Sequence, residues 1–138
     1  MAYLLDTHVW IELAHRNPTV VSRLGSVPTA EVALSPVVLG ELALGELPRK
    51  REEARHSPRR SFVEALADAY STLPLTHHTS FIYARIRREL ENAGERIGAN
   101  DLWIAAQALE HHLTVVTHNI REFSRIPELS IADWQLEP

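Results

Sequence analysis

Three carboxylates stand at positions in the sequence that suit a metal site. Asp6 directly follows the apolar run YLL, Glu41 lies within VVLGELALG, and Asp101 begins the apolar segment DLWIAA. Three carboxylates in one pocket repel one another unless a cation neutralises them. Oxygen ligands without His or Cys suit Mg²⁺ or Mn²⁺, and Mg²⁺ commonly uses one or two carboxylates, waters and substrate phosphates. The pattern favours metal-assisted chemistry on a phosphodiester.

Each of these residues also has a purely structural interpretation. Asp6, Asp101 (or its neighbour Asn100) and Asn119 are residue types that cap helices, and each stands at the start of an expected helix. Glu41 is equally able to pair with an arginine. For each residue taken singly, a structural role (a helix cap or an ion pair) and a role in a metal site are both open. The placement of these residues in the fold distinguishes the two roles.

Short apolar segments alternate along the chain with segments of helical periodicity. Strands are expected at residues 2–6, 31–35, 72–76, 113–118 and 129–134. Helices are expected at residues 7–16, 17–27, 36–47, 59–71, 77–94, 100–112 and 119–123. This alternation predicts a parallel sheet covered on both faces, with ligands bound outside the carboxyl ends of the strands. Asp6 follows the first expected strand, and Thr117 and Asn119 end or follow the fourth.

Length and composition limit the class of protein. With 138 residues and 45% hydrophobic content, the chain is expected to form one globular domain over residues 1–138. The absence of cysteine excludes disulfides, thiolate zinc sites and cysteine nucleophiles. No apolar stretch approaches the roughly 20 residues of a membrane span, and no secretory signal is visible. We therefore expect a soluble cytoplasmic protein with no membrane partner.

The charge of the chain is unevenly distributed. The formal net charge of −4 argues against a uniformly basic nucleic-acid-binding surface. However, the segment RKREEARHSPRR, residues 49–60, contains six basic and two acidic residues. Arginine makes bidentate contacts with phosphate, although a solvated helix face is the simpler interpretation of this segment. Trp103 and Trp134 are interpreted as core or interface residues rather than as base-stacking platforms.

Two other phosphate-handling classes do not fit the first expected strand. A phosphatase of the haloacid-dehalogenase type needs a second Asp two positions after the first, where this chain has His8. No glycine-rich loop follows the strand, which excludes the Walker and dinucleotide-binding fingerprints.

The ordered segments LLDTHVW, GELALG, GANDLWIAAQAL and VVTHNIREF resemble the PIN-domain family, most closely the VapC toxins of bacterial toxin–antitoxin pairs. The resemblance covers essentially the whole chain. It implies a three-layer α/β/α sandwich with a central, mostly parallel five-stranded sheet. It also implies an Mg²⁺- or Mn²⁺-dependent endoribonuclease that forms a homodimer. A small antitoxin would inhibit it through a tail in the active-site groove, and would carry the toxin into a larger complex on DNA.

The resemblance also implies roles for individual residues. Asp6, Glu41 and Asp101 match three acidic residues of the family, with Asp6 and Asp101 as metal ligands and Glu41 orienting a water. Asn119 stands where the family often has a fourth acid, and it offers an oxygen and a donor but no charge. Thr117 would supply a supporting hydroxyl. Attack by a metal-activated water would leave a 5′-phosphate and a 3′-hydroxyl, with residues 49–60 holding the RNA backbone.

Two alternatives stay open. The first is a PIN-like binding module that acts through a complex with a DNA-binding partner and has weak or vestigial nuclease activity; Asn119 keeps this alternative open. The second is a nuclease with another role, such as RNA maturation or cleavage of DNA flaps.

Overall fold

A computed structural model describes residues 1–50 and 61–136 of the chain. The strands are β1 (Tyr3–Leu5), β2 (Val32–Leu34), β3 (Ser71–Thr72), β4 (Thr114–Val116) and β5 (Ile131–Ala132). The α-helices are α1 (Thr7–Ala14), α2 (Pro18–Gly25), α3 (Pro36–Glu46), α4 (Phe62–Ala69), α5 (His77–Asn92), α6 (Ala99–His111) and α7 (Ile120–Phe123). A short 3₁₀ helix, η1 (Thr29–Glu31), precedes β2.

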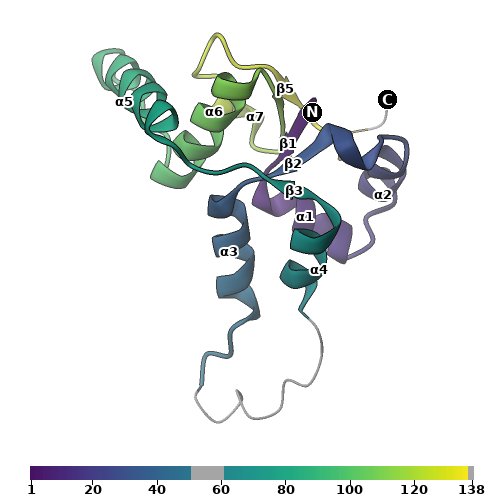
Figure 1. Ribbon diagram of the computed structural model, residues 1–138. Helices are drawn as coiled ribbons and strands as arrows, with labels where there is room; N and C mark the ends of the chain where they lie inside the picture. Colours follow the sequence, from purple (N-terminus) through teal and green to yellow (C-terminus); the bar gives the residue numbers. More distant parts are fainter. Residues whose placement is uncertain (51–60, 137–138) are drawn as a thin grey trace.

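The five strands form one sheet in the order β3-β2-β1-β4-β5, and every neighbouring pair is parallel. Helices cover both faces of this sheet (Figure 1). The predicted three-layer α/β/α sandwich with a central parallel sheet is confirmed. Because β1 lies between β2 and β4, the chain first adds β2 and β3 on one side of β1. It then crosses over and adds β4 and β5 on the other side.

The central strands consist of apolar residues because helices cover them from both sides. Leu4 and Leu5 of β1 and all residues of β2 are buried, as are Val115 and Val116 of β4. A strand buried on both faces has no polar alternation, which explains its continuous apolar sequence. Trp10 of α1 and Phe123 of α7 extend the same core.

The edge strands are shorter than the sequence predicts. The strand expected at 72–76 lies at Ser71–Thr72, although the Leu73 backbone N–H still donates to the Leu34 carbonyl at 2.8 Å. Pro74 has no N–H to continue the ladder, so the pairing ends there. The strand expected at 129–134 is reduced to Ile131–Ala132.

Polar contacts fix the orientation of α6, the helix that carries Asp101. Glu110 near its end accepts hydrogen bonds from the hydroxyls of Thr79 at 2.6 Å and Thr76 at 3.2 Å, at the start of α5. Buried Gln107 donates to the carbonyl of Leu73 at 3.0 Å. These bonds join the second half of α6 to α5 and to the segment after β3.

The helices α3 and α4 project from the sandwich as a pair (Figure 1). The Glu46 carboxylate at the end of α3 accepts a hydrogen bond of 2.9 Å from the Val63 backbone N–H at the start of α4. In the described part of the chain, no helix is both long and apolar enough to cross a membrane.

Candidate active site

The site lies at the carboxyl ends of β1 and β4, where the direction of winding reverses. The Asp6 backbone N–H donates to the Val116 carbonyl at 2.9 Å, which holds the residue after β1 against the end of β4. Such a reversal opens a crevice outside the sheet, because the connections after the two strands diverge. Polar residues after the strands were expected to converge at this edge of the sheet. Asp6 and Thr117 do so.

Both carboxylate oxygens of Asp6 accept hydrogen bonds. The Thr7 backbone N–H donates to Oδ1 at 2.7 Å, and the Thr117 hydroxyl donates to Oδ2 at 2.9 Å. Asp6 is also the N-cap residue of α1. The interpretation of Asp6 as a helix cap is therefore correct. It is compatible with a place in the site, since hydrogen bonds orient the carboxylate from two sides.

The Thr117 hydroxyl connects Asp6 to Asn119. Thr117 is fully buried, and its oxygen accepts a hydrogen bond of 2.9 Å from the Asn119 backbone N–H. Asn119 occupies the N-cap position of α7, but its side chain makes no capping hydrogen bond. As a residue, Asn119 is half-buried.

Glu41 joins the site through Thr7. The Thr7 hydroxyl donates to Glu41 Oε1 at 2.8 Å, across 34 positions of the sequence. Thr7 thus contacts Asp6 with its backbone and Glu41 with its side chain. The sequence had left open that Glu41 pairs with an arginine, and the structure shows the hydrogen bond from Thr7 instead. Thr7 was not among the predicted site residues, since its only local signal is its place directly after Asp6.

Asp101 lies in the first turn of α6, as predicted, but it does not cap the helix. Gly98 is the N-cap residue, so neither Asn100 nor Asp101 has that role. Burial, followed by the negative charges of Asp6, Glu122 and Glu41, raises the pKa of Asp101 to about 6. Glu122 of α7 was not among the predicted site residues, because its segment was interpreted only as a short helix over residues 119–123.

Burial is also the main reason why the pKa of Asp6 is raised above its ordinary value, and the charge of Glu41 adds to it. The hydrogen bonds from Thr117 and the Thr7 backbone oppose this rise, as does nearby His8 to a smaller extent. The charges that act on Asp101 are all negative. The site therefore has an excess of negative charge that a cation would offset.

The donor set fits an oxygen-binding divalent cation held by few protein ligands. Within residues 1–50 and 61–136, no three His, Cys, Asp or Glu side chains come together as a ready metal cage. Mg²⁺ does not need such a cage, since it keeps several waters and binds through one or two carboxylates. Asp6 and Asp101 are the two carboxylates that could supply these ligands.

An open groove runs beside the site between α3 and α6. It has a volume of about 500 Å³ and is lined by Pro36, Val37, Gly40, Glu41, Leu44, Leu75, Asn100 and Trp103. A second hollow continues along α3 from Glu41 to Arg49. Trp134 is buried in the core, as predicted, whereas Trp103 is only half-buried on the wall of the groove.

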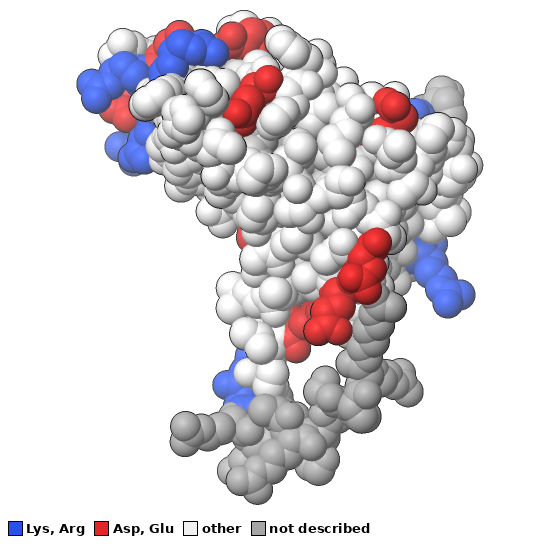
Figure 2. Space-filling view, viewed as in Figure 1, with Lys and Arg blue, Asp and Glu red and all other residues white. Residues whose placement is uncertain are grey.

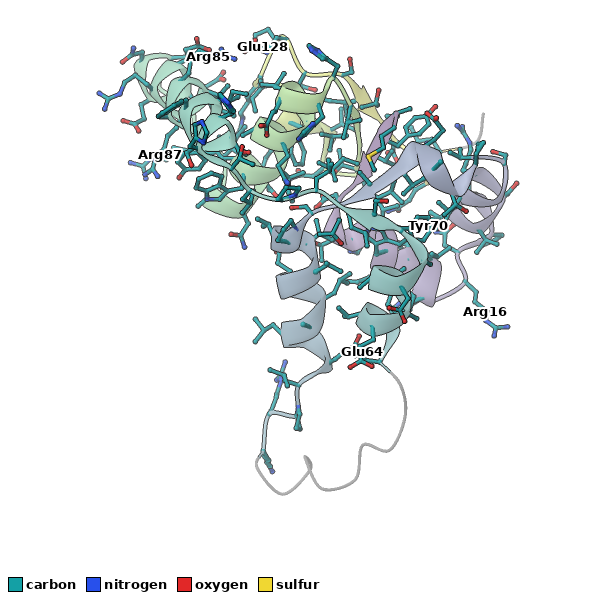
Figure 3. The ribbon with its side chains drawn as sticks, in the orientation of Figure 1. Arg16, Glu64, Tyr70, Arg85, Arg87 and Glu128 are labelled. Carbon is teal, nitrogen blue, oxygen red and sulfur yellow. The ribbon has the colours of Figure 1, made fainter. Side chains whose placement is uncertain are left out.

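Charged side chains are mixed on the face shown in Figure 2. Basic and acidic groups alternate on α5, and acidic groups are prominent over α4. Arg85 pairs with Glu89 and with Glu128, whose side chain lies next to it in Figure 3. The basic segment predicted to hold RNA, residues 49–60, lies outside the described residues except for Arg49 and Lys50.

Comparisons with known proteins identify the family of the chain. The pattern of the PIN domain family matches residues 3–129. Ribonuclease VapC2 of Rickettsia felis is 34% identical, covering 97% of this chain and 98% of that protein. The tRNA(fMet)-specific endonuclease VapC of Salmonella typhimurium is 30% identical, with the same shares. Among solved structures, VapBC2 of Rickettsia felis bound to a promoter DNA fragment has a TM-score of 0.79 and 32% identity, covering 97% of this chain and 99% of that chain. The chain therefore belongs to the PIN-domain family, among the VapC ribonucleases.

Proposed function

We propose that this protein is a metal-dependent endoribonuclease and the toxin of a type II toxin–antitoxin pair. The observation that carries the proposal is the hydrogen-bonded network of Asp6, Thr7, Glu41 and Thr117 at the carboxyl ends of β1 and β4. It lies in a chain that is similar over nearly its whole length to proteins named as ribonucleases. The substrate is RNA, and the reaction is hydrolysis of its phosphodiester bonds.

The metal is Mg²⁺ or Mn²⁺, held by Asp6 and Asp101. Nucleases of the PIN-domain family use a divalent metal, and the all-oxygen donor set of this site fits either ion. When bound, such an ion lowers the pKa of a water ligand and offsets the charge of the scissile phosphate.

The side chains around the metal position the reactants. Thr117 and the Thr7 backbone hold the Asp6 carboxylate in one orientation. Glu41, oriented by the Thr7 hydroxyl, accepts a hydrogen bond from the attacking water and aims it at the phosphorus. Asn119 contributes its amide in place of a fourth carboxylate, so it binds a phosphate oxygen or a water without acting as a base.

The partners follow from the same assignment. A small cognate antitoxin binds the toxin, and the solved VapBC2 relative is a complex bound to a DNA fragment from its promoter. We propose the same assembly for this protein. The toxin would be a homodimer, each chain forming a single domain over residues 1–138, and it would be located in the cytoplasm.

A second candidate function is a binding module with vestigial nuclease activity. Asn119 favours it, because an amide removes one negative charge from the place of an acid. In that case the protein would act mainly through its complex with a DNA-binding partner.

Cleavage of a mixed RNA pool tests the proposal. Purified toxin without antitoxin is incubated with Mg²⁺, with Mn²⁺ or with EDTA, beside Asp6→Asn and Asp101→Asn variants. Exposed Glu95, which lies after α5 and away from the network, provides the control Glu95→Gln. Metal-dependent cleavage by the wild type and the control, abolished in both Asp variants, supports the nuclease.

Folding of each variant is verified by circular dichroism. If the folded wild-type protein leaves the whole pool intact with both metals, the binding module is favoured. If EDTA does not reduce the cleavage, the assignment of a metal to Asp6 and Asp101 is wrong.

A further inference from the structure

Two aromatic rings are stacked beside the catalytic groove. The ring centroids of Tyr83 on α5 and Trp103 on α6 are 4.0 Å apart, with an interplanar angle of 15°. The Arg87 guanidinium donates to the Tyr83 hydroxyl at 2.7 Å, and Arg87 in turn pairs with Glu91 one turn further along α5. Figure 3 labels Arg87 on this helix. Tyr83 is thus held in place and covers one face of the Trp103 indole.

Trp103 differs from the other two tryptophans of the chain. Trp10 and Trp134 are 0% and 3% exposed, whereas Trp103 is only half-buried and lines the open groove. Glu41 of the catalytic network lines the same groove. A tryptophan with one ring face covered by Tyr83 therefore lines the same groove as Glu41.

The chemistry of the groove suits a nucleobase better than a phosphate. Apart from Glu41, its lining side chains are uncharged, and a carboxylate repels a phosphate but not a neutral base. Asn100 on the same wall offers both a donor and an acceptor, as the edge of a base requires. Aromatic faces stack bases of any sequence, and proteins read unpaired RNA bases in this way.

We propose that Trp103, braced by Tyr83, is a stacking site for an unpaired nucleobase next to the cleaved bond. This inference deepens the proposed ribonuclease function and rests on it. It replaces the interpretation of Trp103 as a core residue, because a core tryptophan would not line an open groove, and it competes with the interpretation of Trp103 as an interface residue.

Substitutions at Trp103 separate stacking from apolar packing. Trp103→Leu keeps an apolar side chain but removes the ring, whereas Trp103→Phe keeps a smaller ring. Loss of one stacked base weakens binding by about 5-fold to 150-fold, equivalent to about 1–3 kcal/mol. We expect Trp103→Leu to raise the Kd for RNA by this factor and Trp103→Phe to retain most of the affinity. In cleavage assays the loss should fall mainly on KM.

Affinity is measured by fluorescence anisotropy of 5′-labelled RNA in an Asp6→Asn background, which leaves the RNA uncut, and quenching of tryptophan fluorescence is recorded separately. The probes are a single-stranded RNA octamer, the same octamer without bases, and the corresponding duplex. Stacking on Trp103 predicts quenching by the single-stranded octamer, little quenching by the other two, and loss of the quenched signal in Trp103→Phe. Unchanged binding of the octamer without bases to Trp103→Leu shows that this variant is folded.

Several results would overturn the stacking site. One is binding of the single-stranded octamer to Trp103→Leu within twofold of the parent protein. Another is equal affinity of the parent protein for the octamers with and without bases. A Trp103→Leu variant that binds RNA normally but no longer binds its antitoxin would assign the groove to a protein partner instead.

The two proposals can fail separately. If the single-stranded octamer quenches Trp103 but the wild-type protein cleaves no RNA, the nuclease function is wrong, and Trp103 stacks on a base of bound RNA without a cleaved bond beside it. If the wild type cleaves RNA and Trp103→Leu has the same kcat/KM, the nuclease stands and the stacking site is wrong.

Discussion

Replacement of Asp101 by Asn should abolish cleavage and yet stabilise the metal-free protein. The pKa of Asp101 is about 6 in the folded protein, against 3.8 for an unperturbed Asp. Because the folded state binds this proton more tightly than the unfolded state, stability falls as the pH rises from about 4 to about 6, and the loss persists above that range. The amide introduced by Asp101→Asn carries no charge, so the variant avoids this penalty at neutral pH.

The magnitude follows from the size of the pKa shift. A rise of about two units corresponds to a ceiling of about 3 kcal/mol at 1.36 kcal/mol per unit. Asp101 is only half-buried, and solvent and salt screen its repulsion from Asp6, Glu41 and Glu122. We therefore expect Asp101→Asn to raise the free energy of unfolding by about 1–2 kcal/mol at pH 7.5 and by about half as much at pH 5.

Urea unfolding in EDTA measures this difference, with Glu95→Gln as the control, which should lie within about 0.5 kcal/mol of the wild type. A divalent cation should make the wild type the more stable of the two proteins. A cation present at ten times its Kd stabilises the wild-type fold by about 1.4 kcal/mol and the variant by less. If Asp101→Asn is less stable than the wild type in EDTA at pH 7.5, burial of the Asp101 charge and its repulsion from these carboxylates are not the dominant effects. A gain in the free energy of unfolding of Asp101→Asn that is as large at pH 4 as at pH 7.5 would also contradict this explanation.

Substitutions at three further positions test the network and the sheet that supports it. Thr117→Val removes the donor to Asp6 and the acceptor of the Asn119 N–H, and should cost about 1–3 kcal/mol in urea unfolding. Thr117→Ser should be close to wild type, and equal stability of the Val variant would contradict the role of the hydroxyl. Thr7→Val frees Glu41 and should lower kcat roughly tenfold, the equivalent of one hydrogen bond to a charged group, whereas Thr7→Ser should restore it. Leu5→Ala in β1 should lower stability by about 2–5 kcal/mol in thermal or urea unfolding. A loss below about 1 kcal/mol would mean that β1 is not the centre of the core.

Much of the fold is encoded in local patterns. Apolar runs that end in polar residues identify β1 and β4 and place Asp6 and Thr117 after them. Helical periodicity identifies α5 and α6 and places Asp101 in a first turn. These features depend on neighbours within a few positions, so the sequence alone is enough to predict them.

The lengths of the edge strands are less well predicted. The third strand lies at Ser71–Thr72 rather than at 72–76, and the last strand is confined to Ile131–Ala132 rather than extending over 129–134. An edge strand has a partner on one side only, so Pro74 or a change in chain direction ends it wherever pairing fails. Apolar content alone does not indicate that point.

Local sequence was sufficient to say which residues stand at strand ends and helix starts, and that a parallel sheet would be covered on both faces. Which of these residues touch became known only from the folded chain. Thr117 bonds to Asp6 across 111 positions, Thr7 bonds to Glu41 across 34, and Tyr83 stacks on Trp103 from a neighbouring helix. Such contacts depend on strand order and helix packing, which sum many weak interactions over the whole chain. No local pattern in the sequence contains that information.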